Sequence, residues 1–222
     1  MRKIMTFLIL FISLTYAFGQ TRKDSLIVFV GEKIEVKYSP EEEKEARVDT
    51  IIKGKDTSYV KHVTFRMDNR YSAKYRVLQL VHGSYTSDTI EFIAFDHYGD
   101  PAFSNFKTVL LFVSKYGDKL YHEKYQYFAL YLTENGKWAS PYASGDYNHP
   151  NKDHITVKPE KIPFKERVSI PVDKLTKEDR KIWYPEPYYK IENRKAIAIY
   201  GNYVDDLFKL KQQTILKARG IY

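Results

Sequence analysis

The stretch YRVLQLVHGSYTSDTIEFIAF, residues 75–95, decides the fold. Two segments rich in β-branched and aromatic residues, 71–83 and 89–95, are separated by the polar sequence GSYTSD at 83–88. Such residues favour strands, and a short interval of Gly, Ser and Asp between two strands favours a tight connection. The sequence therefore predicts an antiparallel hairpin at the centre of a β-rich domain.

Upstream of this hairpin, the sequence predicts two further strands. Residues 25–38 begin with a continuous apolar run and then alternate apolar and polar residues, which is typical of a strand. Gly31 lies inside this strand and indicates a bulge. Residues 58–67 alternate in the same way, whereas 39–57 are highly charged and are expected to form a long loop.

Downstream of the hairpin, the chain is less regular. The apolar run 108–115 and the aromatic run 120–132 are predicted strands, joined by a tight turn. Residues 133–194 contain many Gly, Pro, Asn and Ser residues and predict a long irregular extension with a short helix after Thr176. A buried strand at 195–200 and an amphipathic helix that ends at Gly220 are expected to close the domain.

The predicted fold class is β-rich α+β. We expect a single OB-like domain at 20–222, built on a five- or six-stranded antiparallel barrel with a C-terminal helix and a long irregular segment. The barrel core would cover about 25–132, and the irregular extension 133–194. The closing strand and helix at 195–220 would cap one end of the barrel.

The N-terminus has the pattern of a secretory signal peptide at 1–19. Arg2 and Lys3 precede an apolar run, and Ala17 and Gly19 are placed for cleavage before Gln20. The run is shorter than the roughly 20 residues that span a membrane. No second apolar run approaches that length, so no span is expected after cleavage. The chain has no cysteine, which excludes disulfides, thiolate sites and a lipid-modified cysteine. We therefore expect a secreted or periplasmic protein.

Charge and composition exclude several functional classes. The formal net charge is +8, with Lys and Arg scattered along the chain rather than clustered as on a nucleic-acid-binding face. Phosphate-binding glycine loops, dinucleotide fingerprints and serine-hydrolase elbows are absent from the sequence. No cofactor and no nucleic-acid partner are predicted.

Two polar clusters are candidate metal sites. Asp96, His97 and Asp100 lie in FDHYGDPAF at 95–103, and their oxygen and imidazole ligands suit zinc or manganese. The alternative is a turn in which Asp96 caps the backbone and Gly99 has a positive φ. The second cluster consists of Asp146, His149, Asp153 and His154. Neither cluster has a recognised ligand spacing, so both interpretations remain open.

Aromatic residues in irregular segments are candidate binding residues. Tyr and Trp in loops rich in Gly, Pro and Ser are typical of recognition surfaces. The alternative is that the two tryptophans cover the core or plug the barrel ends. The candidate binding residues are Asp96, His97, Tyr98, Asp100, Trp138, Tyr142, Tyr147 and Trp183. Further aromatics of the same kind are Tyr184, Tyr188 and Tyr189.

The barrel segment resembles the netrin and tissue-inhibitor-of-metalloproteinase-like branch of the OB-fold. The resemblance rests on VFVG at 28–31, VLQLVHG at 77–83 and TIEF at 89–92, and covers about half of the chain. The residues that match are Val28, Phe29, Gly31, Val77, Leu78, Gly83, Thr89, Ile90 and Phe92.

This chain departs from the resembled family in one important respect. Inhibitors of the family chelate zinc through an N-terminal cysteine, and position 20 is Gln here, so that mechanism is not implied. The leader that ends in FGQ also resembles those of exported proteins of the Bacteroidetes group.

These observations support three functional hypotheses. The first is an exported, non-enzymatic binding protein of the cell envelope, whose partner is a protein or an envelope component. The second is a small metal-dependent hydrolase that uses Asp96, His97 and Asp100. The third is a purely structural envelope protein. The expected location of any site is the barrel mouth formed by 95–103, near the loop 134–154.

Overall fold

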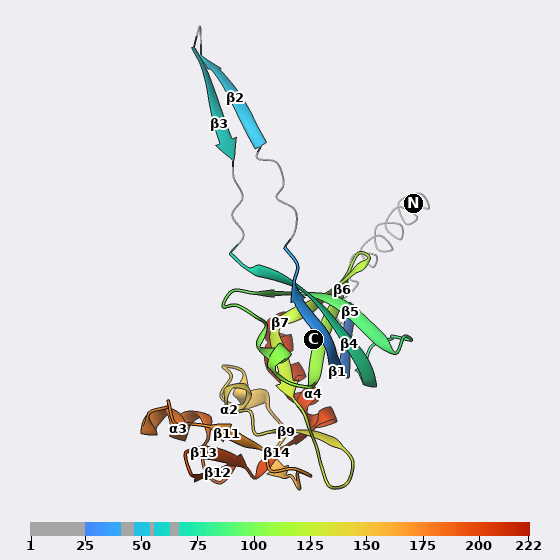
Figure 1. The fold of residues 1–222 in the computed structure, drawn as a ribbon, viewed down its shortest axis with the longest axis vertical. Coiled ribbons are helices and arrows are strands. Elements are labelled where there is room, and N and C mark those ends of the chain that lie inside the picture. Colours follow the sequence, from blue (N-terminus) through green and yellow to red (C-terminus); the bar gives the residue numbers. More distant parts are fainter. Residues whose placement is uncertain (1–24, 41–46, 54–55, 63–66) are drawn as a thin grey trace, which may run out of the picture.

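A computed structural model describes residues 25–40, 47–53, 56–62 and 67–222. The predicted signal peptide at 1–19 lies outside these residues. Five strands close into a barrel in the order β1–β4–β5–β7–β6 (Figure 1). Their bounds are β1 (Leu26–Tyr38), β4 (Asn69–His82), β5 (Thr89–Asp96), β6 (Thr108–Tyr116) and β7 (Lys119–Ala129). The structure therefore confirms a β-rich α+β fold with an OB-like five-stranded barrel.

The strand pairings refine that prediction. Four of the five pairings are antiparallel, including the predicted β4–β5 hairpin, in which Tyr75 lies opposite Ile90. The fifth pairing, β5 with β7, is parallel, with Ile93 opposite Tyr121. The register of β1 against β4 shifts between Val30 and Gly31, so the predicted bulge is present.

The apolar runs of β1 and β6 are explained by burial of both strand faces. Ile27 and Phe29 point into the barrel interior, whereas Leu26 and Val28 belong to a second core cluster on the outer face. Successive side chains of a strand point to opposite faces, so a strand buried on both sides is apolar at every position. Phe112 on β6 belongs to the same outer cluster.

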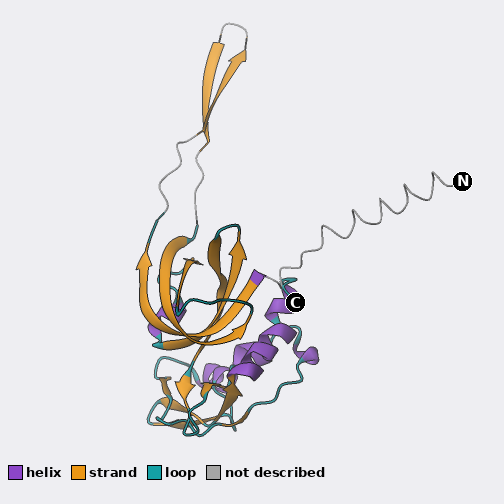
Figure 2. Cartoon of the chain, turned by 90° about the vertical axis from the view of Figure 1, so that its right-hand side faces the viewer, coloured by secondary structure: helices purple, strands orange, loops and turns teal. Residues whose placement is uncertain are grey.

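The C-terminal helix covers this outer face. It consists of α4 (Val204–Gln213) and α5 (Ile215–Ala218), separated at Thr214, whose hydroxyl donates to the carbonyl of Leu210 at 2.7 Å. Leu207 and Phe208 of α4 pack in the same cluster as Val28 and Phe112. The helix therefore lies against the side of the barrel and does not cap its end as expected (Figure 2).

A different residue fills the interior of the barrel. Phe103, from the short 3-10 helix η3 (Ala102–Asn105), is fully buried among the barrel-interior side chains. Its ring lies 4.6 Å from that of His122 and 6.0 Å from that of Tyr75. The end of FDHYGDPAF is thus part of the core.

Residues 131–203 form a second layer beside the barrel, in which short strands and helices are set within the predicted long irregular segment. One sheet has the order β10–β14–β9–β8 and another has the order β11–β13–β12. The strands are β8 (Tyr131–Leu132), β9 (Trp138–Pro141), β10 (Glu160–Lys161), β11 (Ser169–Pro171), β12 (Tyr189–Glu192), β13 (Lys195–Ala198) and β14 (Tyr200–Tyr203). The helices are α2 (Ser144–Tyr147), η4 (Lys152–His154) and α3 (Lys177–Trp183). Strands of two to four residues are too short to show periodicity, which is why few of them beyond the run at 195–200 were predicted from the sequence.

Residues 195–200 also differ from expectation. They contribute to β13 and β14 of the second layer and do not close the barrel. The barrel is closed instead by the pairing of β1 with β6, in which Phe29 lies opposite Leu111.

A two-stranded hairpin extends away from the barrel between β1 and β4 (Figure 1). It pairs β2 (Arg47–Lys53) with β3 (Asp56–His62), with Thr50 opposite Tyr59. The prediction of a loop over 39–57 is therefore wrong for the β2 portion. Thr50, Ile51, Tyr59 and Val60 are exposed, so this hairpin does not require the buried apolar face that marks a strand in a sequence.

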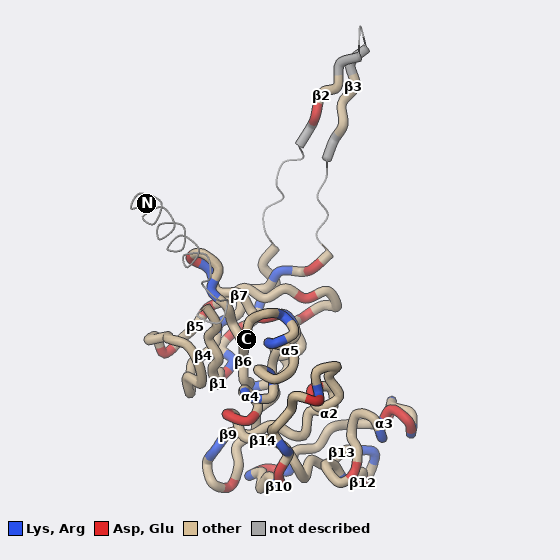
Figure 3. Tube along the Cα trace, turned by 180° about the vertical axis from the view of Figure 1, so that it is seen from behind, with Lys and Arg blue, Asp and Glu red and all other residues tan. Residues whose placement is uncertain are grey.

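Charged residues are interspersed over the described molecule and form no large basic face (Figure 3). Within residues 25–40, 47–53, 56–62 and 67–222, no helix has the length and apolar character needed to cross a membrane.

Candidate functional site

The connection 95–103 has the contacts of a turn. The carboxylate of Asp96 accepts a hydrogen bond from the backbone N–H of Tyr98 at 2.9 Å, and Gly99 has a φ of +121°. The Nδ1 atom of His97 lies 2.8 Å from the carbonyl oxygen of Met67. These are the contacts expected if the segment is a polar turn, and the imidazole of His97 contacts a backbone carbonyl. Over the part of the chain that the structure describes, no three His, Asp or Glu side chains are arranged to hold a metal.

The second polar cluster is also dispersed. Asp146 forms an ion pair with Lys211 of α4. His149 accepts a hydrogen bond on Nδ1 from the backbone N–H of Asn151 at 3.0 Å. Asp153 lies exposed in η4. Asp146 and His149 therefore have separate partners, Asp153 and His154 are exposed, and the described groups of this segment do not converge on a metal site.

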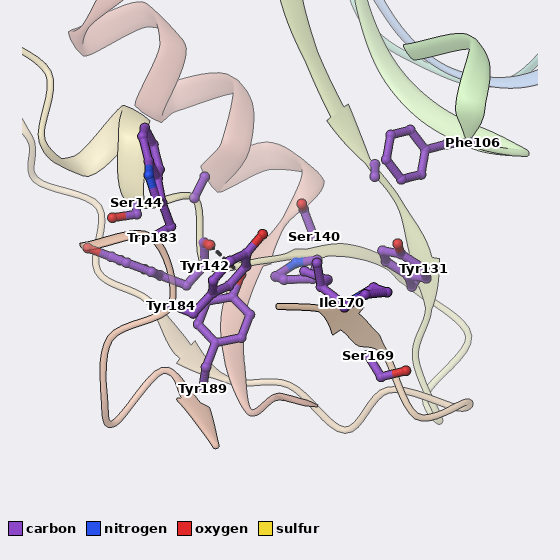
Figure 4. A pocket seen from close by; sticks show the side chains of 14 residues that line it. Phe106, Tyr131, Ser140, Tyr142, Ser144, Ser169, Ile170, Trp183, Tyr184 and Tyr189 are labelled. Carbon is purple, nitrogen blue, oxygen red and sulfur yellow. Dashed lines mark hydrogen bonds between the residues drawn. The ribbon is translucent and has the colours of Figure 1, made fainter. Parts of the chain in front are cut away.

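The structure instead brings aromatic residues together around a cleft of about 550 Å³ (Figure 4). The cleft lies between the second layer and the part of the barrel that carries Phe106 and Ala129. Its aromatic lining consists of Phe106, Tyr131, Tyr142, Trp183, Tyr184 and Tyr189. None of the 14 described residues that line it carries a charged side chain. The cleft therefore offers flat apolar surfaces and a few hydroxyl groups.

Stacking and hydrogen bonds fix the tyrosine rings on one side of the cleft. The ring of Tyr142 stacks on Tyr188 with centroids 3.8 Å apart and on Tyr147 with centroids 4.9 Å apart. The hydroxyl of Tyr189 donates to the carbonyl of Tyr142 at 2.6 Å, and that of Tyr147 donates to Oδ1 of Asn202 at 2.9 Å. Side chains held in this way bind a ligand with little further loss of conformational entropy.

Burial favours the neutral form of the phenols in the cleft. It raises the pKa of the Tyr131, Tyr142 and Tyr184 phenols above the ordinary value. These phenols are therefore neutral at physiological pH and act as hydrogen-bond donors and acceptors without charge.

A buried ion pair supports the wall of the cleft from behind. Lys211 of α4 is bound to Asp146 of α2, and its Nζ atom lies 4.6 Å from the centre of the Phe128 ring. The hydroxyl of Ser144, also on α2, donates to the carbonyl of Ile182 on α3. The short helix α2 is thus attached both to the helix that packs on the barrel and to the segment that carries Trp183.

The candidate binding residues occupy three different places. Tyr142 and Trp183 line the cleft, and Tyr147 lies directly behind Tyr142. Trp138 packs against the cluster formed by α4 and the outer face of the barrel. Asp96, His97, Tyr98 and Asp100 are not among the lining residues. The connection 95–108 reaches the cleft through Phe106 and not through its polar turn.

Several lining residues were not among the candidates. Phe106 precedes β6, Tyr131 lies on β8 and Ile170 lies on β11, so they come from distant parts of the chain. Tyr184 and Tyr189 share the aromatic segment after Trp183, and that local density of tyrosines was the only available signal. The remaining residues have ordinary strand or loop sequences, and only the packing of the second layer on the barrel brings them together.

Comparison of the chain with protein-family models, with characterised proteins and with solved structures found no match. The functional argument therefore depends on the chemistry of the cleft itself.

Proposed function

We propose that this chain is an exported, non-enzymatic binding protein of the cell envelope, and that the aromatic cleft holds its partner. The observation that supports this most directly is the uncharged aromatic lining of a cleft of about 550 Å³. Binding sites generally have volumes of roughly 300–1,000 Å³ and apolar walls with a few placed polar groups. Tyr and Trp contribute strongly to binding because they combine a large apolar area with a polar atom.

The same lining favours binding over catalysis. Its described residues include Ser140, Ser144 and Ser169 but no histidine, carboxylate or lysine beside them. A serine nucleophile needs an adjacent general base, and the hydroxyl of Ser144 is already donated to the carbonyl of Ile182. The groups present suit recognition of a ligand without acid–base chemistry.

Export is supported by the sequence. The charged residues Arg2 and Lys3, the apolar run and the small residues Ala17 and Gly19 together have the order of a signal peptide. The netrin-like character of the barrel is likewise a proposal. Its motif residues fall on β1, β4 and β5, except Gly83, which directly follows β4, and Phe29, Ile90 and Phe92 lie in the barrel interior.

Photocrosslinking in intact cells tests the proposed function. A photoreactive residue would replace Trp183 in the cleft, and the matched control would place it at Tyr98, which is 88% exposed and outside the cleft. We expect a discrete adduct from position 183 that is absent from position 98. No adduct at 183 would contradict a binding role for the cleft. Stoichiometric metal in the purified protein that is lost in His97→Ala would favour the hydrolase alternative instead.

A further inference from the structure

The hydrogen-bonding groups that remain available in the cleft are hydroxyls, which can donate and accept, and the indole N–H of Trp183, which can only donate. The hydroxyls of Ser144 and Tyr189 already donate to backbone carbonyls. The hydroxyls of Tyr131 and Tyr184 and the indole N–H of Trp183 make no hydrogen bond to any described residue. A ligand that fills the cleft must therefore supply acceptors, because a donor that is buried without a partner costs free energy.

The lining also limits the acceptors that the cleft can offer to a ligand. Its side chains include no carboxylate and no carboxamide among the described residues. A saccharide presents many hydroxyl donors, and the only side-chain acceptors in the described lining are the oxygens of Ser and Tyr hydroxyls. A fatty chain presents no polar atom at all and would leave Tyr131, Tyr184 and Trp183 unpaired. Both ligand classes therefore fit the cleft poorly.

The arrangement of the rings indicates a linear ligand. In Figure 4, Trp183 lies at one end of the cleft and Phe106 and Tyr131 lie at the other, with Ser140 and Ile170 between them. The rings of Tyr142, Tyr184 and Tyr189 also lie on the Trp183 side in Figure 4, so aromatic surfaces are spread along the line from Trp183 to Phe106. An extended chain can contact both ends at once.

We propose that the cleft binds a proline-rich segment of a partner protein in the polyproline II conformation. Proline rings pack well on aromatic faces, and the polyproline II helix leaves its carbonyl oxygens free to accept hydrogen bonds. Proline has no N–H, so such a segment needs few acceptors from the cleft. It is also largely preformed, which lowers the entropic cost of binding. This inference rests on the proposed function of the cleft and specifies its ligand.

A peptide-binding experiment on the mature protein tests the inference. The probe is a fluorescent peptide of about ten prolines, roughly three turns of the helix, and the matched control is a Gly-Ser peptide of equal length. We expect saturable binding of the proline peptide only, measured by fluorescence anisotropy. Because the lining is uncharged, its affinity should change little between about 0.1 and 1 M salt.

Three variants locate the binding site. Trp183→Ala should weaken binding about tenfold or more, because it removes the half-exposed aromatic ring at one end of the cleft. Tyr184→Phe keeps the ring, removes one free donor and should weaken binding about two- to tenfold. Tyr98→Ala removes an exposed ring outside the cleft and should leave the affinity unchanged. Thermal unfolding of each variant verifies that it is folded.

Three results would overturn the inference. The first is equal affinity for the Gly-Ser peptide, and the second is an affinity for the proline peptide that Trp183→Ala does not change. The third is binding of a neutral oligosaccharide that Trp183→Ala abolishes, which would leave the proposed binding function intact. Failure of the proposed function itself is recognised separately, by the absence of a crosslink at position 183.

Discussion

At the scale of single residues, Lys211 connects the main parts of the molecule. Its ammonium group, on α4, is buried between Asp146 of α2 and the ring of Phe128 on β7. Burial lowers its pKa, and the neighbouring carboxylate of Asp146 opposes that shift. Removing one member of a buried pair leaves an uncompensated charge and lowers stability, whereas replacing both members by apolar residues can leave stability nearly unchanged.

A double-mutant cycle on this pair follows from that reasoning. Asp146→Asn should lower the free energy of unfolding by about 3 kcal/mol, because it leaves the Lys211 ammonium buried without a counterion. The double variant Asp146→Asn, Lys211→Met should recover most of that loss, because methionine keeps the apolar stem. Urea unfolding measures each value. The control is Glu91→Gln in the exposed pair Lys74–Glu91, which should change stability little, and additive losses in the cycle would contradict the prediction.

His122 is a second residue whose surroundings determine its behaviour. Its ring packs beside Phe103 in the barrel, and its Nε2 atom lies 2.8 Å from the carbonyl of Gln126, across a bulge in β7. Burial lowers its pKa to about 4, and the hydrogen bond to Gln126 only partly opposes this shift. The imidazole is therefore neutral in the native protein at physiological pH.

The stability of the protein should consequently fall with pH below about 6.5, the ordinary pKa of an unfolded histidine. Between pH 6.5 and the native pKa of about 4, the unfolded state binds the extra proton and the native state does not, so acidification favours unfolding. From pH 7 to 5 this amounts to roughly 2 kcal/mol. Comparison of urea unfolding for the parent, His122→Gln and the exposed-histidine control His97→Gln measures it. An unchanged pH dependence in His122→Gln would show that other groups cause the loss.

At the scale of elements, the end of β4 lies tightly against β1. Gly83 has a φ of +83°, and a Cβ atom there would lie 2.4 Å from the carbonyl oxygen of Leu26. Gly99 also has a positive φ, but a Cβ atom there would meet nothing within 4 Å. Both glycines have a positive φ, which other residues rarely adopt. Only at Gly83 would a side chain also collide with the neighbouring strand.

Alanine substitutions at these two glycines separate the two effects. Gly99→Ala should cost about 1 kcal/mol through backbone strain alone. Gly83→Ala should cost clearly more, because β1 and the hairpin must move apart. Thermal and urea unfolding of the two variants compare the costs directly. Equal costs would mean that β1 adjusts without loss of packing.

At the scale of the whole molecule, α4 lies between the barrel and the second layer. The cluster around Leu207 includes Val28 and Phe112 of the barrel, and Trp138 and Tyr147 of the second layer pack against it. The hairpin β2–β3 forms a separate two-stranded sheet. The barrel therefore depends on C-terminal residues to bury the outer face of β1 and β6, whereas the hairpin forms a sheet of its own.

Two truncations test this organisation. A mature chain that ends at residue 132 loses α4 and exposes the outer face of β1 and β6, so it should aggregate or lack a cooperative unfolding transition. Replacement of residues 47–62 by a short Gly-Ser linker should change Tm by less than about 3 °C. Circular dichroism and size-exclusion chromatography measure both outcomes. A soluble, cooperatively folded 20–132 fragment would show that the barrel is an independent unit.

The barrel was predictable from the sequence because its signals are local and long. The strand runs at 25–38, 71–83, 89–95 and 108–115 each exceed six residues, and the turn at 83–88 contains the glycine that its backbone requires. The C-terminal helix was predictable for a similar reason, because its apolar residues recur at helical spacing along 204–218. The second layer was not predictable, because β8 and β10 have only two residues each and are stabilised by partners far away in the chain.

The candidate site was predictable only in part, for the same physical reason. The density of Tyr and Trp in loops pointed to Tyr142 and Trp183, because aromatic composition is visible residue by residue. Their convergence with Phe106, Tyr131 and Ile170 results from packing between segments separated by tens of residues. The sequence by itself determined the barrel strands, the barrel class and the C-terminal helix, since these follow from periodicity. Only the tertiary structure decided which aromatic rings share a cleft and which acidic and histidine side chains are turn or ion-pair partners.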